Sequence, residues 1–388
     1  MGYVAVSGGE QAIAASLDLL ERERVAGGRS IDPELIAQTM PRAVEQVQSE
    51  GSVWAPEVAA IALKQAAGSI EEAVFLVRAY RSTLERLYTS RVIDGREMRV
   101  GRRISAAFKD IEGGQILGAT RDYSHRLINF DLADEADVDV RRRRAELNEA
   151  LDAACGSYLA TAEKHPLDRV PKVCDYLREV GMLRTYGIDE TEPVDITKTP
   201  LAFPASRSVV LQALSRGLTQ AVIAIGYAAI RGFGMSHPTV GELRHGTVPV
   251  TIDAPGTQPG EGTEDDAYYL GEIPVCEVES LIVSDDVNDE GTHISALDVG
   301  YGLVMGGDES KAIAMSVLDH SLRADDPRYP TQDQEFVLYH IDGVEATGFI
   351  SHLKLPHYVT FQSKLDSTLR SMNNAEAKKG DASDAEEL

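Results

Sequence analysis

Two histidines lie five residues apart in the segment SHLKLPHY at residues 351–358. On a regular helix, positions i and i+5 point away from each other, and on a strand they face opposite sides. Pro356 changes this geometry, because it disfavours helical dihedral angles at Leu355 and has no backbone donor. We therefore expect a helix that ends near Lys354, followed by a turn that brings the rings of His352 and His357 together.

Such a pair predicts a metal site, because imidazole nitrogen suits zinc, copper, iron and nickel. Two ligands do not complete a zinc sphere, which usually has three or four protein ligands. The missing ligands would come from elsewhere in the fold, from substrate or water, or from another chain. The alternative is structural: one histidine caps the interrupted helix and the other packs, as is common for so short a motif.

The segment from Arg99 to Phe130 is a candidate anion site. It is rich in glycine and arginine and is the most cationic stretch of an acidic protein. Guanidinium groups and backbone amides are the groups that bind phosphate oxygens. The alternative is a basic loop balanced by acidic neighbours, because charge clusters are often solvated faces. The candidate anion-binding residues are Arg102, Arg103, Lys109, Gly113, Gly114, Gln115, His125 and Arg126.

The composition is that of an acidic globular protein. The 388 residues are 43% hydrophobic, enough for two or three domains with a substantial core. Asp and Glu number 62 against 38 Lys and Arg, and the net charge of −24 argues against nucleic-acid binding. An acidic, lysine-poor surface indicates a salt-loving cell, because salt screens the self-repulsion.

The sequence also indicates a cytoplasmic protein that does not enter a membrane. No apolar run is long enough to span a bilayer, and the N-terminus lacks the pattern of a secretory signal. The three cysteines have no metal-site spacing and are odd in number, which favours a reducing compartment without disulfides. They are Cys155, Cys174 and Cys276.

The expected fold class is α+β, with a mostly helical N-terminal region followed by a mixed α/β C-terminal domain. We predict domains at residues 1–190 and 191–372, and a disordered acidic tail at 373–388. Asp32-Pro33 and Ser69 carry helix-start signals. The further expected helices are Val209–Arg231, Glu309–Leu322, Gly343–Lys354 and Tyr358–Met372, and the expected strands are Thr247–Ile252, Val275–Val283 and Glu335–His340.

Several long, ordered segments together resemble one family. The resemblance runs from Tyr3 to about Leu369, and it identifies the chain as similar to PhnI, the I subunit of the carbon–phosphorus lyase core complex. That complex extracts phosphate from phosphonates. The segments are ALKQAAGSIEEAVFLVRAYR at 62–81, RRISAAFKDIEGGQILGATRDYSHRL at 102–127, DITKTPLAFPASRS at 195–208, IRGFGMSHPTVGELRHG at 230–246, GYGLVMG at 300–306 and DQEFVLYHIDGVEATGFISHLKLPHYVTFQ at 333–362.

The resemblance implies a transferase, a subunit of alpha-D-ribose 1-methylphosphonate 5-triphosphate synthase. The family displaces adenine from C1′ of MgATP with an oxygen of methylphosphonate, and alone it acts as a nucleosidase that uses water on ATP or GTP. The implied partners are the G, H, J and K subunits, with L in the synthase step. The family's histidine pair corresponds to His352 and His357 and is implied to hold Zn²⁺ near the J subunit, and Mg²⁺ accompanies the triphosphate.

This chemistry indicates what other residues must do. Breaking an N-glycosidic bond passes through an oxocarbenium-like state, which a carboxylate and a proton donor would favour. The candidates are Glu242, Asp122 and His125, although Glu242 could instead form a structural ion pair with Arg244. A triphosphate needs arginines, glycine amides and Mg²⁺. The segment around Arg102 meets that need, and Arg207 and His237 are further pocket candidates.

Two departures from bacterial relatives remove potential phosphate contacts. Val299 precedes Gly300-Tyr301-Gly302 where a basic residue is expected, and Ser7 stands where the relatives can carry lysine. Two other functions remain open. The chain could be a scaffold that supplies zinc ligands to the J subunit, or an autonomous metallohydrolase, which would require a full zinc sphere within this chain.

Overall fold

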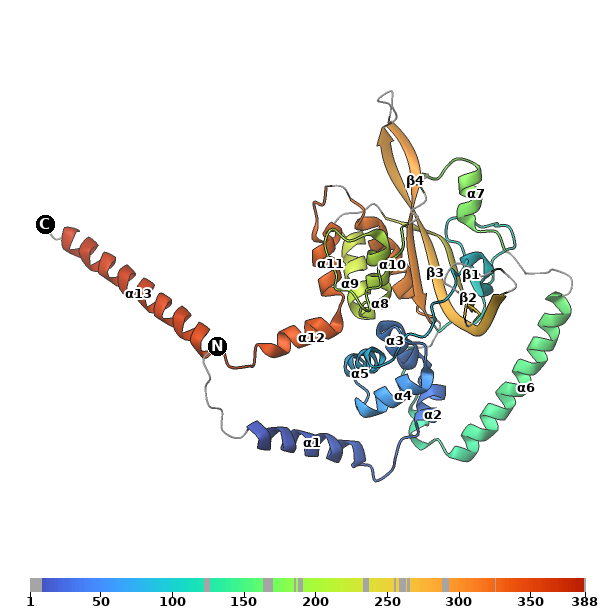
Figure 1. Cartoon of the computed structure of the whole chain (residues 1–388), viewed down its shortest axis with the longest axis horizontal. Coiled ribbons are helices and arrows are strands. Elements are labelled where there is room, and N and C mark those ends of the chain that lie inside the picture. The colour runs from blue at the N-terminus through green and yellow to red at the C-terminus, as the bar shows by residue number, and fades with distance from the viewer. Residues whose placement is uncertain are drawn as a thin grey trace.

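An antiparallel sheet forms the centre of the molecule in the computed structural model (Figure 1). Among the described residues its strand order is β1-β2-β3-β4, so each strand pairs with its neighbour in sequence. The strands are β1 (Arg99–Ile104), β2 (Thr239–Asp253), β3 (Ala267–Val287) and β4 (His293–Met305). The structure describes residues 9–121, 126–162, 170–184, 186–187, 191–232, 237–254, 256–257, 263, 266–287, 293–324 and 326–386.

The alternation of side chains along β3 gives the sheet two different faces. Cys276 and Val278 belong to the main hydrophobic core, and the Ser280 hydroxyl lies 2.7 Å from that of Ser316 on a covering helix. Glu277 and Glu279 point to the opposite face, where Lys172 bridges them at 2.7 and 3.1 Å. One face is therefore apolar and the other carries buried ion pairs.

Four helices cover the apolar face, and they build the main core with it. Among them α10 lies directly on β4, because two glycines of that strand leave no side chain between the backbones. A Cβ at Gly300 would lie 2.0 Å from the carbonyl oxygen of Ser316, and one at Gly302 would lie 2.0 Å from that of Ala312. The helices are α8 (Arg207–Arg216), α9 (Thr219–Ile230), α10 (Glu309–Ser321) and α11 (Gln334–His340).

A second group of helices comes from the N-terminal part of the chain and has a core of its own. The start signals act as predicted: Asp32 accepts a hydrogen bond from the Glu34 amide at 3.0 Å, and Ser69 accepts one from the Glu72 amide at 3.3 Å. The helices are α2 (Pro33–Thr39), α3 (Pro41–Gly51), α4 (Pro56–Gln65) and α5 (Ile70–Ser82).

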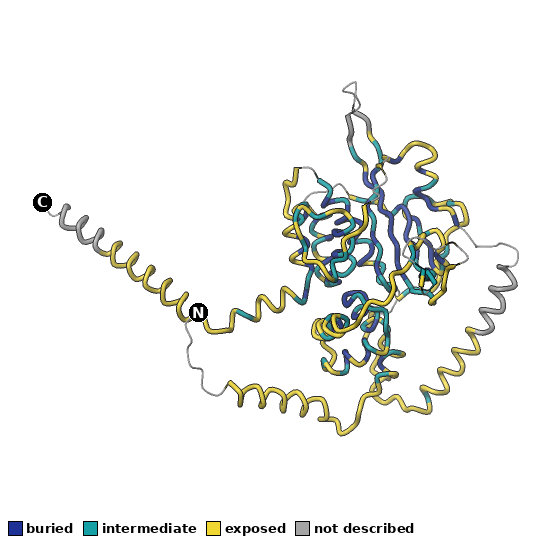
Figure 2. Tube along the Cα trace, in the orientation of Figure 1, coloured by how far each residue is buried: buried dark blue, intermediate teal, exposed yellow. Residues whose placement is uncertain are grey.

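Several helices extend away from this body and are largely exposed where their side chains are described (Figure 2). They are α1 (Gly9–Val25), α6 (Asp137–Ala162), α12 (Gly343–His352) and α13 (Tyr358–Glu386), while the short α7 (Val173–Glu179) packs against the sheet beside Leu281. In the described part of the chain, no helix combines the length and the apolarity needed to cross a bilayer.

The α+β fold class is confirmed, with the helices α1 to α5 preceding the sheet. The division into domains stays a prediction, although β1 comes from the first half of the chain and pairs with β2 from the second. The backbone of the tail predicted to be disordered continues α13 as a helix to Glu386. Alanine, lysine and glutamate in that tail are strong helix formers, which accounts for the difference.

The strand predicted at Glu335–His340 is wrong, because these residues form α11. Asp333 caps this helix by accepting a hydrogen bond from the Phe336 amide at 2.9 Å, and Val337, Leu338 and Ile341 share its buried face. The long helix predicted from Val209 to Arg231 is also wrong. It breaks after Arg216, where the Leu218 amide donates to the Ile341 carbonyl at 2.7 Å instead of continuing the helix.

Strands β2 and β3 are longer than predicted, and β4 was not predicted at all. Its sequence contains Gly300 and Gly302, which weaken the propensity signal of a strand. Glycine is required at both positions because α10 packs directly on the strand there. Residues close in sequence give no sign of that contact.

Candidate functional site

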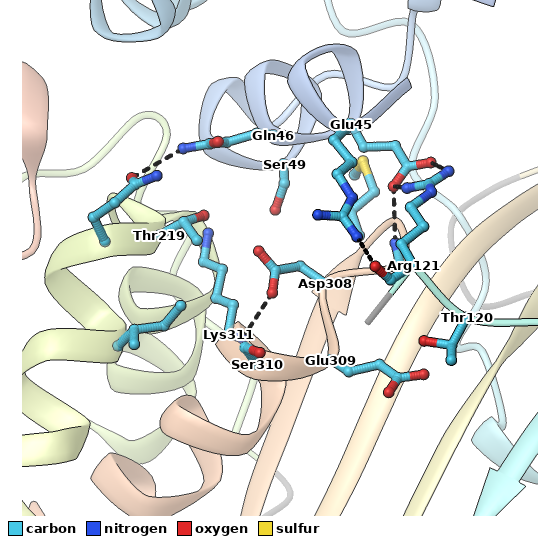
Figure 3. Close-up of a pocket in the computed structure, with 15 residues that line it drawn as sticks. Glu45, Gln46, Ser49, Thr120, Arg121, Thr219, Asp308, Glu309, Ser310 and Lys311 are labelled. Atoms are coloured by element: carbon cyan, nitrogen blue, oxygen red, sulfur yellow. Dashed lines mark hydrogen bonds and ion pairs between the residues drawn. The ribbon is translucent and has the colours of Figure 1, made fainter. Parts of the chain in front are cut away.

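A cleft of about 300 Å³ lies between α3, the start of α9 and the first turn of α10 (Figure 3). Its floor follows a strand–turn–helix sequence. Strand β4 ends at Met305, Gly306 turns the chain with φ of 87°, and Asp308 caps α10 by accepting a hydrogen bond from the Lys311 amide at 2.9 Å. Positive φ at this turn favours glycine. The first turn of α10 therefore faces the cleft.

Side chains of α3 fix the start of α9, which forms another wall of the cleft. Glu50 accepts a hydrogen bond from the Thr219 amide at 2.9 Å and so caps α9, whose own N-cap residue, Leu218, has no suitable side chain. Gln46 donates to Glu50 at 2.8 Å and to Gln220 at 3.1 Å. The start of α9 is thus fixed by α3.

An ion pair closes the outer side of the cleft. Arg121 binds Glu45 through two hydrogen bonds of 2.8 and 2.9 Å, and Glu45 also accepts one from the Gly307 amide at 3.2 Å. Burial alone would raise the pKa of Glu45, but the bonds from Arg121 and Gly307 hold it below its usual value. The carboxylate of Glu45 is therefore ionised, and the guanidinium of Arg121 balances its charge.

Two buried polar side chains that line the cleft have no hydrogen-bond partner in the described structure. Lys311 is 1% exposed and Ser49 is 8% exposed, and neither Nζ nor Oγ is bonded. In Figure 3 the side chain of Lys311 extends from α10 toward Thr219, and Ser49 projects into the cleft from α3 above. Burial lowers the pKa of Lys311 to about 8, while Glu50 and Asp308 act in the opposite direction through space.

Two of the predicted arginines are buried and bonded within the protein. Arg102 is paired with Glu309 at 2.6 Å and donates to the Leu117 carbonyl. Arg103 is paired with Glu242 and also donates to the carbonyls of Glu112, Gly114 and Pro171. These guanidinium groups hold β1 to its surroundings, so the geometry favours a positioning role over direct contact with an anion.

Glu242 is 2% exposed and uses both carboxylate oxygens. One binds Arg103 and the other accepts a hydrogen bond from the Val173 amide at 3.0 Å. The structural alternative named Arg244 as its partner, and that partner is wrong: Arg244 binds Glu277 from the neighbouring strand at 3.0 Å. The catalytic assignment of Glu242 stays a prediction. In the structure its carboxylate lies in an ion pair with Arg103 and does not line the cleft.

Residues 105–115 of the arginine-rich segment form a loop that internal hydrogen bonds hold. The Gln115 side chain holds it by accepting a hydrogen bond from the Ser105 amide at 3.0 Å and donating to the carbonyls of Ser105 and Phe108. Gly113 packs so closely against Val170 that a Cβ there would lie 2.6 Å from it. Lys109, Gly114 and Arg126 are exposed, and Asp122 and His125 lie outside the described residues.

Two further pocket candidates lie apart from the cleft. Arg207 binds the buried carboxylate of Asp319 through hydrogen bonds of 3.1 and 2.8 Å, and Asp319 also accepts one from the Tyr301 amide at 2.9 Å. His237 is exposed, with its Nδ1 2.9 Å from the Pro238 carbonyl oxygen. Neither is among the residues that line the cleft with Lys311.

The histidine turn has the predicted shape. Helix α12 ends at His352, α13 begins at Tyr358, and the ring centroids of His352 and His357 lie 5.5 Å apart with their planes at 62°. Each Nδ1 faces a backbone carbonyl oxygen, that of Phe349 for His352 and that of Leu355, at 2.6 Å, for His357. A carbonyl only accepts, so both Nδ1 atoms carry the proton and both Nε2 lone pairs are available to a metal.

These two residues fit half of a zinc site. In the part of the chain that the structure describes, no group of three or more His, Cys, Asp or Glu residues is arranged to hold a metal ion. Cys174 and Cys276 are buried, and burial raises the thiol pKa of both. A metal ion held by this pair would need further ligands from beyond the described part of the chain.

The sequence analysis did not identify the cleft residues Lys311 and Ser49. A signal existed in Gly306-Gly307, which directly precede the cap and first turn of α10, because glycine turns before helices expose backbone amides. The burial of both polar side chains depends on how α3, α9 and α10 come together around the cleft, and no local pattern contains it.

Comparison with known proteins gives the family. The family model "Bacterial phosphonate metabolism protein (PhnI)" matches residues 2–376. HtxH of Stutzerimonas stutzeri, whose assignment as a C-P lyase subunit is provisional, is 42% identical over 383 residues, 97% of this chain and 98% of that protein.

Two relatives carry an activity in their names. The alpha-D-ribose 1-methylphosphonate 5-triphosphate synthase subunit PhnI of Escherichia coli is 42% identical over 374 residues, 94% of this chain and 96% of the relative. The protein of the same name from Rhizobium meliloti is 39% identical over 377 residues, 95% and 94% of the two chains. A match of this extent leaves no large region unaccounted for, and the chain belongs to the PhnI family of bacterial phosphonate metabolism proteins.

Proposed function

We propose that this chain is a subunit of alpha-D-ribose 1-methylphosphonate 5-triphosphate synthase within a carbon–phosphorus lyase complex. In the reaction, an oxygen of methylphosphonate forms a bond to C1′ of MgATP, the C1′–N bond to adenine breaks, and adenine leaves with a proton. The observation that carries the proposal is 42% identity to a synthase subunit over 94% of this chain. Water in place of the phosphonate would give the nucleosidase side reaction on ATP or GTP.

The proposed nucleotide-binding residues separate into two kinds by their contacts within the protein. Lys109, Gly114 and Arg126 are exposed and can contact the triphosphate or its Mg²⁺ shell. Arg102, Arg103, Gln115 and Gly113 act as positioning residues, because their bonds and packing fix the strand and loop that carry the exposed group. Asp122 and His125 are the proposed carboxylate and proton donor, since Glu242 is held by Arg103.

For the remaining pocket candidates we propose weaker roles that the contacts support. Arg207 is 49% exposed in its side chain although it binds Asp319, so one edge of its guanidinium remains accessible to an anion. His237 is exposed close to the start of β2. Both would act on substrate from a side other than the cleft.

We further propose that His352 and His357 hold Zn²⁺ together with ligands from a partner subunit, the J subunit. The support is the closeness of the two imidazole rings, whose centroids lie 5.5 Å apart, at the turn between α12 and α13. A bound zinc ion would supply Lewis-acid polarisation of an oxygen ligand and would join the two chains. The histidines themselves orient that ion, because hydrogen bonds at Nδ1 fix their rings.

The wider assembly follows from the same proposal. Its members are the G, H, J and K subunits, with L in the synthase step, in the cytoplasm. The free, buried Cys174 and Cys276 are compatible with a reducing compartment. The net charge of −24 supports a salt-rich habitat, which greater stability in molar KCl than in dilute buffer would test.

Adenine release tests the proposed function. We expect the purified chain with MgATP to release adenine and ribose 5-triphosphate, and the reconstituted complex with methylphosphonate to form the ribosyl phosphonate product. A chain that releases no adenine, alone or in the complex, would contradict the synthase proposal. Release by the complex but not by the chain would favour the second candidate, a scaffold that supplies zinc ligands, which the exposed position of the histidine turn favours.

A further inference from the structure

We propose that the cleft between α3 and α10 binds an oxyanion, a phosphoryl or phosphonyl group, through the ammonium of Lys311 and the hydroxyl of Ser49. The cleft contains none of the exposed residues assigned above to the triphosphate. The inference deepens the proposed function, on which it rests only for the choice of anions to test.

The first support is the state of Lys311. A buried ammonium without a hydrogen-bond partner costs several kcal/mol, and such groups are normally paired. Lys311 is 1% exposed and its Nζ is bonded to nothing in the described structure. The two nearest acids act on it only through space, because Glu50 caps α9 and Asp308 caps α10. Its N–H donors are left for a ligand.

The second support is a matching group on the opposite wall. Ser49 belongs to α3, and its Oγ is buried and bonded to nothing in the described structure. Both side chains line the same cavity and come from different helices (Figure 3). A tetrahedral oxyanion presents several acceptor oxygens at once, so one group can accept from the ammonium below and the hydroxyl above.

The third support is the field at the floor. Helix α10 has 13 residues, and its N-terminus carries a partial positive charge that favours an anion. Gly306 and Gly307 leave the approach to this turn without bulky side chains. This backbone contribution adds to Lys311 and does not stand alone.

The charge balance of the lining permits an anion. Arg121 neutralises Glu45, and Arg102 neutralises Glu309. Among the other charged residues of the lining, Arg42 and Lys311 face a single acid, Asp308, whose carboxylate is engaged as the helix cap. The volume of about 300 Å³ lies at the lower end for ligand sites, so it suits a phosphate or phosphonate group better than a whole nucleotide.

Calorimetric titration of the full chain tests the site. The probes are tripolyphosphate and, separately, methylphosphonate, and the variants are Lys311→Met and Ser49→Ala. We expect Lys311→Met to weaken binding by about 10- to 100-fold and Ser49→Ala by about 3- to 10-fold, as for a charged and a neutral hydrogen bond. Lys198→Met removes an exposed lysine outside the cleft and serves as the matched control, with unchanged binding. Circular dichroism establishes that each variant is folded.

The two probes distinguish the source of the anion. Lys311-dependent binding of tripolyphosphate identifies the nucleotide tail, and Lys311-dependent binding of methylphosphonate identifies the attacking phosphonate. The proposal is overturned if neither anion binds at millimolar concentration, or if Lys311→Met binds as tightly as the unaltered chain, which would leave the cleft with ordered water alone.

Adenine release separates this inference from the proposed function. A chain that binds tripolyphosphate through Lys311 but releases no adenine in the complex would remove the function and keep the site. A complex whose adenine release and anion affinity are both unchanged by Lys311→Met would keep the function and remove the site.

Discussion

Arg102 on β1 and Glu309 in the first turn of α10 form a buried ion pair, with 2.6 Å between Nε and Oε1. The two side chains are 6% and 13% exposed, and they join the arginine-rich strand to the helix that bounds the cleft. The most cationic stretch of the sequence is thus partly neutralised inside the protein. The buried arginines Arg102 and Arg103 therefore fix the position of β1, and their charges are balanced by Glu309 and Glu242.

We expect Arg102→Met to lower the free energy of unfolding by about 3–5 kcal/mol, because it leaves Glu309 buried without a partner. Urea unfolding monitored by circular dichroism measures the change. The double variant Arg102→Met, Glu309→Gln should recover much of the loss, since the unpaired charge is gone. Arg99→Met is the control: its pair with Glu272 is 79% exposed at the arginine, so the change should stay below about 1 kcal/mol. Equal effects at both positions would contradict the assigned role.

Lys311→Met should stabilise the protein at neutral pH. The buried ammonium has a pKa of about 8 in the folded chain, against a usual value of 10.5, which corresponds to about 3 kcal/mol. Below pH 8 the lysine is charged in both states, and the full penalty applies. Between pH 8 and 10.5 the unfolded chain holds more protons than the folded one, so the stability of the unaltered protein rises toward that of the variant.

Thermal unfolding of the two proteins across pH 7 to 10.5 checks this sign. The gap in stability should be largest at pH 7 and should shrink above pH 8. Lys198→Met, at an exposed position, should show no such pH-dependent gap. A variant that is less stable than the unaltered protein at pH 7 would mean that Lys311 is a structural residue held by water.

Gly302→Ala tests the packing of α10 on β4. The added Cβ would lie 2.0 Å from the Ala312 carbonyl oxygen, so the helix must move away from the sheet. We expect a loss of about 3 kcal/mol or more, at the upper end for overpacked cores. The matched control is Gly348→Ala in α12, where nothing lies within 4 Å and helix propensity should give a gain of up to about 1 kcal/mol. Denaturant midpoints compare the two, and a tolerated Gly302→Ala would contradict the close contact.

Metal content of the purified complex tests the histidine turn. We expect bound zinc in the unaltered complex and its loss in His352→Ala and in His357→Ala, because each substitution removes one of two ligands from this chain. His340→Ala is the control, since His340 is also exposed, also faces a carbonyl through Nδ1, and stacks on Phe336. Mass spectrometry of the metal measures the content. Unchanged zinc in either variant would remove that histidine from the site.

The features that the sequence predicted are local ones. The start of α5 was predictable because the capping bond from the Glu72 amide to Ser69 spans only three residues. The break between α12 and α13 was predictable because Pro356 acts on the residue directly before it. The family was predicted from long motifs, and the match over residues 2–376 confirms it. These inferences needed no knowledge of which segments meet in space.

The features that the sequence did not predict depend on distant contacts. Glu242 binds Arg103, 139 positions earlier, and not the nearby Arg244, because strand alternation alone does not say which charges meet across the sheet. The residues of α11 have the sequence pattern of a strand. They form a helix because Asp333 caps it and its apolar face packs into the core. The burial of Lys311 without a hydrogen-bond partner among the described residues appears only when the helices around the cleft are brought together. The proposed roles of Asp122 and His125 stay predictions.

Gly300 and Gly302 place the backbone of α10 against that of β4, and this contact decides how the protein can respond to an occupant. Because no side chains lie between α10 and β4 at these two described positions, α10 has little freedom to tilt relative to the sheet. Its first turn is therefore expected to move together with the sheet. On the other side of the cleft, the N-terminal helices reach α9 and the turn before α10 through polar contacts, Glu50 with Thr219 and Glu45 with Gly307. Adjustment to a bound molecule would therefore be a shift of α3 over a stationary platform.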